Sequence, residues 1–182
     1  MSTQKSVQRE AGSVEASPAL RLEQEKVEQL VDALNTDLAA TYVLYHQLKK
    51  HHWNVEGAEF RDLHLFLGEA AEELEEAADE LAERVQALGG VPLARGAEFE
   101  EHAPIEPEDD DVYDIRTSLE NDMDAYGDII EMVREHVELT QNLGDHASSE
   151  LLRRQLLELE EDAHHIEHYL EDDTLVLDSA TK

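Results

Sequence analysis

The sequence predicts an all-α fold, a four-helix bundle with one long crossover, and three observations support this prediction. Four long segments repeat apolar residues at steps of three and four, which is the spacing of one face of a helix. The connections are short within the first pair and within the second pair, but long between the pairs. Alternating apolar and polar residues, the pattern of a strand, are absent. A length of 182 residues suits one domain.

The first pair of helices is predicted over about residues 18–53 and 58–88. Ser17 and Pro18 resemble an N-cap followed by proline at the first helical position. A short turn follows Asn54, and Gly89-Gly90 ends the second helix.

The crossover spans about residues 91–110, with a short helix expected around 95–101. The second pair is predicted over about 111–143 and 146–171, and Asp145 is expected to cap the last helix. The bundle would therefore span residues 18–171, between a flexible N-terminal tail (1–17) and a C-terminal tail (172–182).

Acidic residues dominate the composition. Asp and Glu number 45 against 14 Lys and Arg, a formal net charge of −31, which disfavours direct nucleic-acid binding. Because molar salt would screen the self-repulsion, the charge favours a halophile with a salt-filled cytoplasm. The alternative is an ordinary acidic protein.

Several functional classes are excluded by what the sequence lacks. It has no cysteine, which excludes disulfides, thiolate metal sites and cysteine nucleophiles. It also lacks an apolar signal core and any run long enough to span a membrane, so we expect a cytoplasmic protein.

A set of metal-ligand side chains shares one side of the second helix. With His64 at zero on a helical wheel, Asp79 falls near ~60°, Glu72 near ~80° and Glu83 near ~100°, away from the apolar stripe near ~270°. Small residues lie beside them, which suggests that another helix approaches closely there, and we expect it to come from another subunit. The small residues are Gly68, Ala71, Ala78 and Ala82.

His64 and Asp79 are too far apart to hold one ion within a single chain. Their separation of 15 residues corresponds to about 22 Å along a helix. Two antiparallel copies of the helix across a two-fold axis would bring His64 of one copy near Asp79 and Glu83 of the other. The spacing therefore predicts a site between subunits.

Each of these residues also has a structural explanation. His52 falls on the apolar stripe of the first helix, where a lone histidine is usually a hydrogen-bonded core residue. Asp79 and Glu83 are spaced like a solvated pair, and Trp53 is of a type that usually packs.

Taken together, these residues resemble the Dps family, the ferritin-like proteins that protect DNA during starvation. The matching segments are His52-Trp53-Asn54-Val55 with Gly57, then Phe60, Leu63-His64, Asp79-Glu80-Leu81-Ala82-Glu83-Arg84, and Leu88-Gly89-Gly90. The intervals of 12, 15 and 4 residues between His52, His64, Asp79 and Glu83 agree with the family's metal motif.

The resemblance implies a hollow dodecamer built from two-fold dimers, with a ferroxidase centre at each dimer interface. His52 and His64 would come from one subunit, and Asp79 and Glu83 from its partner. Carboxylate and imidazole suit Fe(II). Two electrons would pass to hydrogen peroxide, or to O₂, and Fe(III) oxide would collect inside the shell. Trp53 would lie beside the centre as a candidate electron donor.

One position departs from the family pattern. The family usually carries an acid one turn after the second histidine, where this chain has Gly68. Either the centre has one ligand fewer, or Glu72 on the same face replaces it, and we expect one iron to bind tightly and another weakly.

Further candidate metal ligands lie outside this motif. Asp162, and with it Glu158, match the segment of the last helix whose acids line iron-admitting pores in the family. His164 and His168 have metal-pair spacing, although surface histidine pairs are common. Glu56 could relay iron or be a simple loop acid.

Two competing functions are a DNA-compacting protein and a structural helical oligomer. Family members that bind DNA usually carry lysine-rich tails, whereas the N-terminal tail here is nearly neutral and the C-terminal tail is acidic. Any protection of DNA is therefore expected to be chemical, by removing iron and peroxide.

Overall fold

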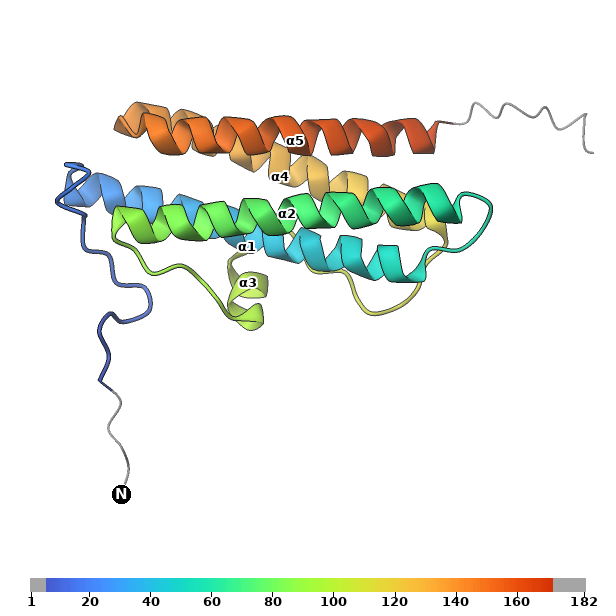
Figure 1. Cartoon of the computed structure of the whole chain (residues 1–182), viewed down its shortest axis with the longest axis horizontal. Helices are drawn as coiled ribbons and strands as arrows, with labels where there is room; N and C mark the ends of the chain where they lie inside the picture. Colours follow the sequence, from blue (N-terminus) through green and yellow to red (C-terminus); the bar gives the residue numbers. More distant parts are fainter. Residues whose placement is uncertain (1–5, 172–182) are drawn as a thin grey trace, which may run out of the picture.

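The computed structural model describes residues 6–171, and this part of the chain is helical with no β-strand. The helices are α1 (Gln24–Asn54), α2 (Phe60–Leu88), α3 (Gly96–His102), α4 (Ile115–Leu143) and α5 (His146–Leu170). The four long helices form the bundle, and α3 lies in the crossover between α2 and α4 (Figure 1). The prediction of an all-α four-helix bundle with a long crossover is confirmed. The predicted C-terminal tail, residues 172–182, lies outside the described residues.

The bundle consists of two antiparallel hairpins. α1 packs most extensively on α2, and α4 packs on α5. The short helix α3 lies against α1, where Phe99 stacks on Tyr42 with ring centroids 4.5 Å apart. The turn between α1 and α2 and the carboxyl end of α5 lie at the same end of the bundle (Figure 1).

The apolar stripes predicted from periodicity form one continuous core. Its largest fully buried side chains come from all four long helices and include Leu34, Leu67, Tyr126 and Leu152. Removing this apolar surface from water supplies the main driving force for folding. Among residues 6–171, no helix is both long and apolar enough to cross a membrane.

The first helix begins later than predicted. Ser17 does not cap it, because α1 starts only at Gln24, after a turn; the backbone N–H of Ser17 donates instead to the Leu88 carbonyl at 3.1 Å. The Glu15 N–H likewise donates to the Gly89 carbonyl. Residues 15–17 of the predicted tail are therefore attached to the carboxyl end of α2.

The last two helices show how the sequence sets their ends. α4 starts at Ile115 rather than at 111, because the Asp114 side chain caps it by accepting from the Thr117 N–H. Gly144 adopts a φ of 86°, a left-handed conformation that suits glycine, and ends α4. Asp145 caps α5, as predicted, by accepting from the Ser148 N–H at 3.1 Å.

Candidate metal centre

Two histidines lie face to face where α1 ends and α2 begins. The imidazole rings of His52 and His64 stack with centroids 3.9 Å apart and planes 16° from parallel. Nδ1 of His52 lies 2.6 Å from the backbone oxygen of His64, and Nδ1 of His64 lies 2.8 Å from the backbone oxygen of His52. The turn that joins the two helices makes this reciprocal pairing possible.

The reciprocal bonds fix the tautomer of both rings. A carbonyl oxygen can only accept a hydrogen bond, so each Nδ1 must carry the proton. In the neutral rings, both Nε2 atoms then keep a lone pair. Histidine ligands in metal sites are commonly oriented in this way, with the second nitrogen donating to a carbonyl or carboxylate. The pair is thus prepared to offer two nitrogen ligands.

Gly68 makes room for the His52 ring. A Cβ atom at this position would lie 2.9 Å from Cε1 and 3.0 Å from Nδ1 of His52, closer than real Cβ atoms approach. On the other side of the pair, Phe60 stacks on His64 with centroids 5.1 Å apart. At position 68, where an acid is expected, the lack of a side chain therefore lets the His52 ring pack directly on the backbone of α2.

The carboxylates of the predicted motif lie farther along α2. Asp79, Glu83 and Glu72 are all exposed, whereas His52 and His64 are partly buried. Within residues 6–171, no three His, Asp or Glu side chains are close enough together to hold a metal ion. Within one chain, the histidines of the motif therefore lie at the α1–α2 turn, and its acids lie farther along α2. Trp53, next to His52, leaves 68% of its surface exposed, so it does not pack within its own chain.

The small residues of α2 differ in their exposure. Gly68, Ala71 and Ala78 are buried within the chain, whereas Ala82 is partly exposed. Gly68 faces His52 of α1, so at this position the close neighbour is α1 of the same hairpin. The approach of a helix from another subunit stays a prediction.

The core histidine is His51, not His52 as periodicity suggested. His51 is 4% exposed, and its Nδ1 lies 2.9 Å from both Asp122 oxygens while its Nε2 lies 2.7 Å from Glu108. Burial alone would lower the pKa of His51, but Asp122 and Glu108 raise it, so the imidazolium form is favoured. Lys50 and Asn121 also bind Glu108 and so attach the crossover to the bundle. No local pattern could predict this network, because its bonded partners are 13 to 71 residues apart in the sequence.

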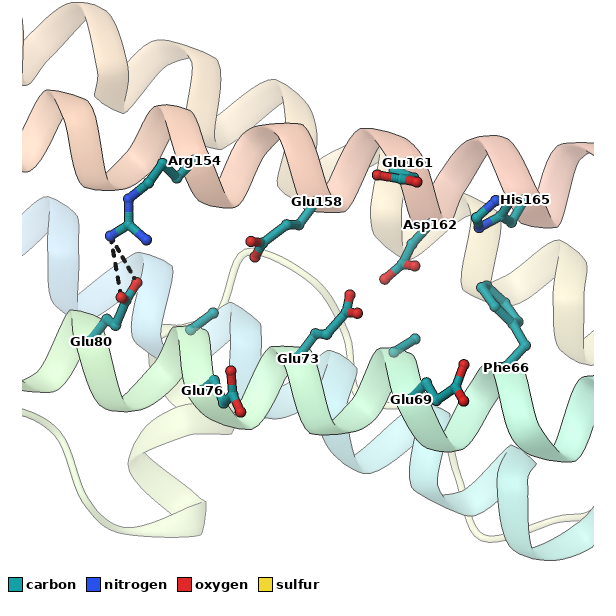
Figure 2. A pocket seen from close by; sticks show the side chains of 12 residues that line it. Phe66, Glu69, Glu73, Glu76, Glu80, Arg154, Glu158, Glu161, Asp162 and His165 are labelled. Atoms are coloured by element: carbon teal, nitrogen blue, oxygen red, sulfur yellow. Dashed lines mark hydrogen bonds and ion pairs between the residues drawn. The ribbon is translucent and has the colours of Figure 1, made fainter.

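An acidic groove runs between α2 and α5. Its volume is about 410 Å³, and carboxylates of both helices point into it (Figure 2). Two predicted ligands, Glu158 and Asp162, line it from α5. Its carboxylates are Glu69, Glu73, Glu76, Glu80, Glu158, Glu161 and Asp162.

The surroundings in the groove raise the pKa of two of its carboxyl groups. Burial, followed by the charges of Glu158 and other acids, raises the pKa of Glu73. Burial raises the pKa of Asp162 to about 6, although the Tyr126 hydroxyl donates to it at 2.9 Å. Among the described residues, the basic side chains that line the groove are Arg154, which pairs with Glu80 at 3.2 Å, and His165. The groove is thus a strongly negative surface with little compensation.

The remaining candidate ligands are exposed. The Nε2 atoms of His164 and His168 lie 3.1 Å apart near the end of α5, each ring also lying near a glutamate. Glu56 lies in the turn between α1 and α2, exposed and close in sequence to His52.

Comparison with known proteins identifies a matching family and relatives of this chain. A model of the ferritin-like domain matches residues 31–176. The DNA protection during starvation protein of Halobacterium salinarum is 70% identical over 180 residues, which cover 99% of both chains. The nutrient stress-induced DNA-binding protein of a Nostoc species is 38% identical and covers 91% of this chain and 90% of its own.

Solved structures show the same likeness. The crystal structure of an archaeal Dps homologue from Halobacterium salinarum matches with a TM-score of 0.94 at 70% identity, over 98% of this chain and 99% of that one. The Dps protein of Vibrio cholerae, described as a ferritin-like diiron-carboxylate protein, matches with a TM-score of 0.81 at 28% identity, over 87% of this chain and 99% of its own.

Proposed function

This chain belongs to the Dps family of ferritin-like proteins, and on that premise we propose that it oxidises ferrous iron and stores the ferric product. Hydrogen peroxide, or O₂, is the proposed oxidant. The observation that carries the proposal is the locked pair of His52 and His64, whose two Nε2 atoms are left free to bind iron.

The proposed centre lies between two subunits. His52 and His64 of one chain would bind ferrous iron together with Asp79 and Glu83 of an antiparallel partner. The exposure of both acids, and the absence of any complete metal site within residues 6–171, support a shared centre. Imidazole and carboxylate together suit ferrous iron, and carboxylates also accommodate the harder ferric ion.

In the proposed reaction, two ferrous ions each give up one electron. Hydrogen peroxide takes both electrons, its O–O bond breaks, and its oxygen atoms leave as water after taking up protons. Trp53 lies next to His52 and is the proposed electron donor when only one iron is bound. Because the peroxide receives its electrons in a pair, hydroxyl radicals are avoided, and this is the proposed way in which DNA is protected.

The other candidate residues have proposed roles in moving iron. Glu72 would serve as the substitute ligand for the acid that is missing at Gly68, and Glu56 would pass iron toward the centre. The acids of the groove, among them Glu158 and Asp162, would collect ferric oxide or line an entry route. The exposed pair of His164 and His168 would bind iron in transit. We place this chemistry in the cytoplasm, within a dodecamer of two-fold dimers.

A mixed-subunit experiment tests the shared centre. The double variant His52→Ala/His64→Ala and the double variant Asp79→Asn/Glu83→Gln should each lose ferric absorbance when the protein is given ferrous iron and peroxide. Co-expression of the two in equal amounts should restore about a quarter of the centres, because random pairing makes half of the dimers mixed and each mixed dimer has one intact centre. Recovery would not occur if each centre were built within one chain.

Direct DNA binding is not part of the proposal. The net charge of −31 opposes a phosphate backbone, so the assembled protein should not retard DNA in a gel at physiological salt. Retardation by the assembled protein, together with unchanged iron content after exposure to ferrous iron, would favour a DNA-compacting protein instead.

A further inference from the structure

A small pouch inside the bundle contains a carboxylate oxygen that has no partner. Asp37 of α1 is 1% exposed, and its Oδ1 pairs with Nδ1 of His136 at 2.7 Å. Its Oδ2 is the one buried side-chain oxygen or nitrogen within residues 6–171 for which no hydrogen-bond partner is found. Buried polar groups are normally satisfied, because losing water without a replacement costs about 2–7 kcal/mol. Something outside the protein is therefore expected at Oδ2.

The walls of the pouch are negative. Besides Asp37, three further carboxylates line it, Glu73 from α2 and Glu158 and Asp162 from α5. Its other lining residues are neutral and include Thr41 and the buried Gln155, and the basic side chain of the described residues that contacts Asp37 is His136, on the opposite oxygen. In Figure 2, Glu73 reaches across from α2 toward Glu158 and Asp162.

The pouch is small and is continuous with the acidic groove. Its volume of about 20 Å³ admits one or two species the size of water. Glu73, Ala77, Glu158 and Asp162 line both the pouch and the groove. The acids of the groove thus also border the pouch that Asp37 lines.

We propose that this pouch is a binding site for one divalent cation of the hard class that includes Mn²⁺ and ferrous iron, with Asp37 Oδ2 as its direct ligand. The wall offers carboxylate, hydroxyl and amide oxygens, and hard cations prefer oxygen. No three acidic or histidine side chains within residues 6–171 lie close enough together to bind one ion directly, so Glu73, Glu158 and Asp162 act on the ion through their negative charge. The site lies within one chain and is separate from the centre formed by His52 and Asp79.

Mn²⁺ serves as the probe, since it does not need to be oxidised to be detected. The full-length assembled protein is titrated in about 1 M KCl, which screens loose binding to the acidic surface. Free Mn²⁺ is followed by electron paramagnetic resonance. An Asp79→Asn background weakens the interface centre, so that a fault in the proposed ferroxidase does not affect the result. We expect one salt-resistant Mn²⁺ per chain in this background.

Two variants and one control decide the outcome. Asp37→Asn keeps the shape and an acceptor for His136, and it should lose the salt-resistant ion. Glu158→Gln is on the exposed rim, so it should fold normally and raise the Kd for Mn²⁺ about tenfold. Glu69→Gln, which lines the groove but not the pouch, should bind as the background does.

The proposal is overturned if Asp37→Asn binds as much salt-resistant Mn²⁺ as its parent, since Oδ2 would then hold a proton or a water. Should Asp37→Asn not assemble, Glu158→Gln decides instead, and an unchanged Kd overturns the proposal.

Discussion

The imidazoles of His52 and His64 orient each other, since each Nδ1 donates to the backbone oxygen of the other residue. The two residues are 12 positions apart, on the last turn of α1 and the first turns of α2. The same hairpin turn that joins the helices thus also aligns the proposed iron ligands. Neither ring needs a separate carboxylate to set its tautomer.

Replacing Gly68 should disturb this pair. In Gly68→Ala the new Cβ would lie 2.9 Å from the His52 ring, which must move and lose its bond to the His64 carbonyl. We expect ferrous affinity to fall about 10- to 100-fold. Isothermal titration with Fe²⁺ under anaerobic conditions measures the change.

Gly127→Ala is the matched control for this variant. Gly127 is an exposed glycine inside α4 with nothing within 4 Å of an added Cβ, so its replacement should leave iron binding unchanged and stabilise the helix by about 1 kcal/mol. Equal affinity in the two variants would show that the His52 ring adapts without cost.

Replacing His51 should lower the free energy of unfolding far more than replacing an exposed histidine. His51→Ala leaves the buried Asp122 and the partly buried Glu108 without their shared partner, which is expected to cost about 3–5 kcal/mol. Chemical denaturation in molar salt measures the loss. His46→Ala on the same helix is the control, because His46 is exposed, bonds to the Tyr42 carbonyl and packs edge-on against Tyr45. A loss no larger than that of His46→Ala would mean that the network is not structural.

The ion pair between Asp145 and Arg84 should make stability depend on pH. Burial opposes the charged form, but Arg84 and Ser148 hold the pKa of Asp145 below its ordinary value of 3.8. A lowered pKa means that the unfolded chain binds more protons near this pH, so the stabilisation is present above 3.8 and is lost as the pH falls through the lower folded value.

Asp145→Asn isolates this contribution. Asparagine still caps α5, but the charge is lost, and we expect a destabilisation of about 1.5–3 kcal/mol at neutral pH. The difference from the wild type should shrink once the pH falls below 3.8. A difference that stays constant with pH would assign the effect to the cap alone.

Salt should stabilise this protein strongly. With a net charge of −31, lowering the screening length from about 30 Å at 0.01 M to about 3 Å at 1 M removes most of the self-repulsion. The Tm should therefore rise steeply with KCl, measured by circular dichroism. Sucrose serves as the uncharged control and should raise the Tm much less. A Tm independent of KCl would count against a salt-filled cytoplasm.

The sequence by itself determined the helices and most of their ends. Apolar spacing, Gly89-Gly90 and the cap at Asp145 are local signals, and local geometry is what periodicity reports. It also indicated that His64 and Asp79 cannot share an ion within one chain, because helical rise fixes their separation.

Only the tertiary structure decided which neighbours each residue meets. The sequence around Ser17 resembles the start of a helix, but in the folded chain the Ser17 N–H donates to the Leu88 carbonyl at the end of α2, and α1 starts only at Gln24. Gly68 of α2 receives the His52 ring of α1, and the buried carboxylates Asp37 and Asp122 pair with histidines that are far away in the sequence. These contacts join segments that are far apart in the sequence, and the spacing of residues along the chain does not report which segments meet.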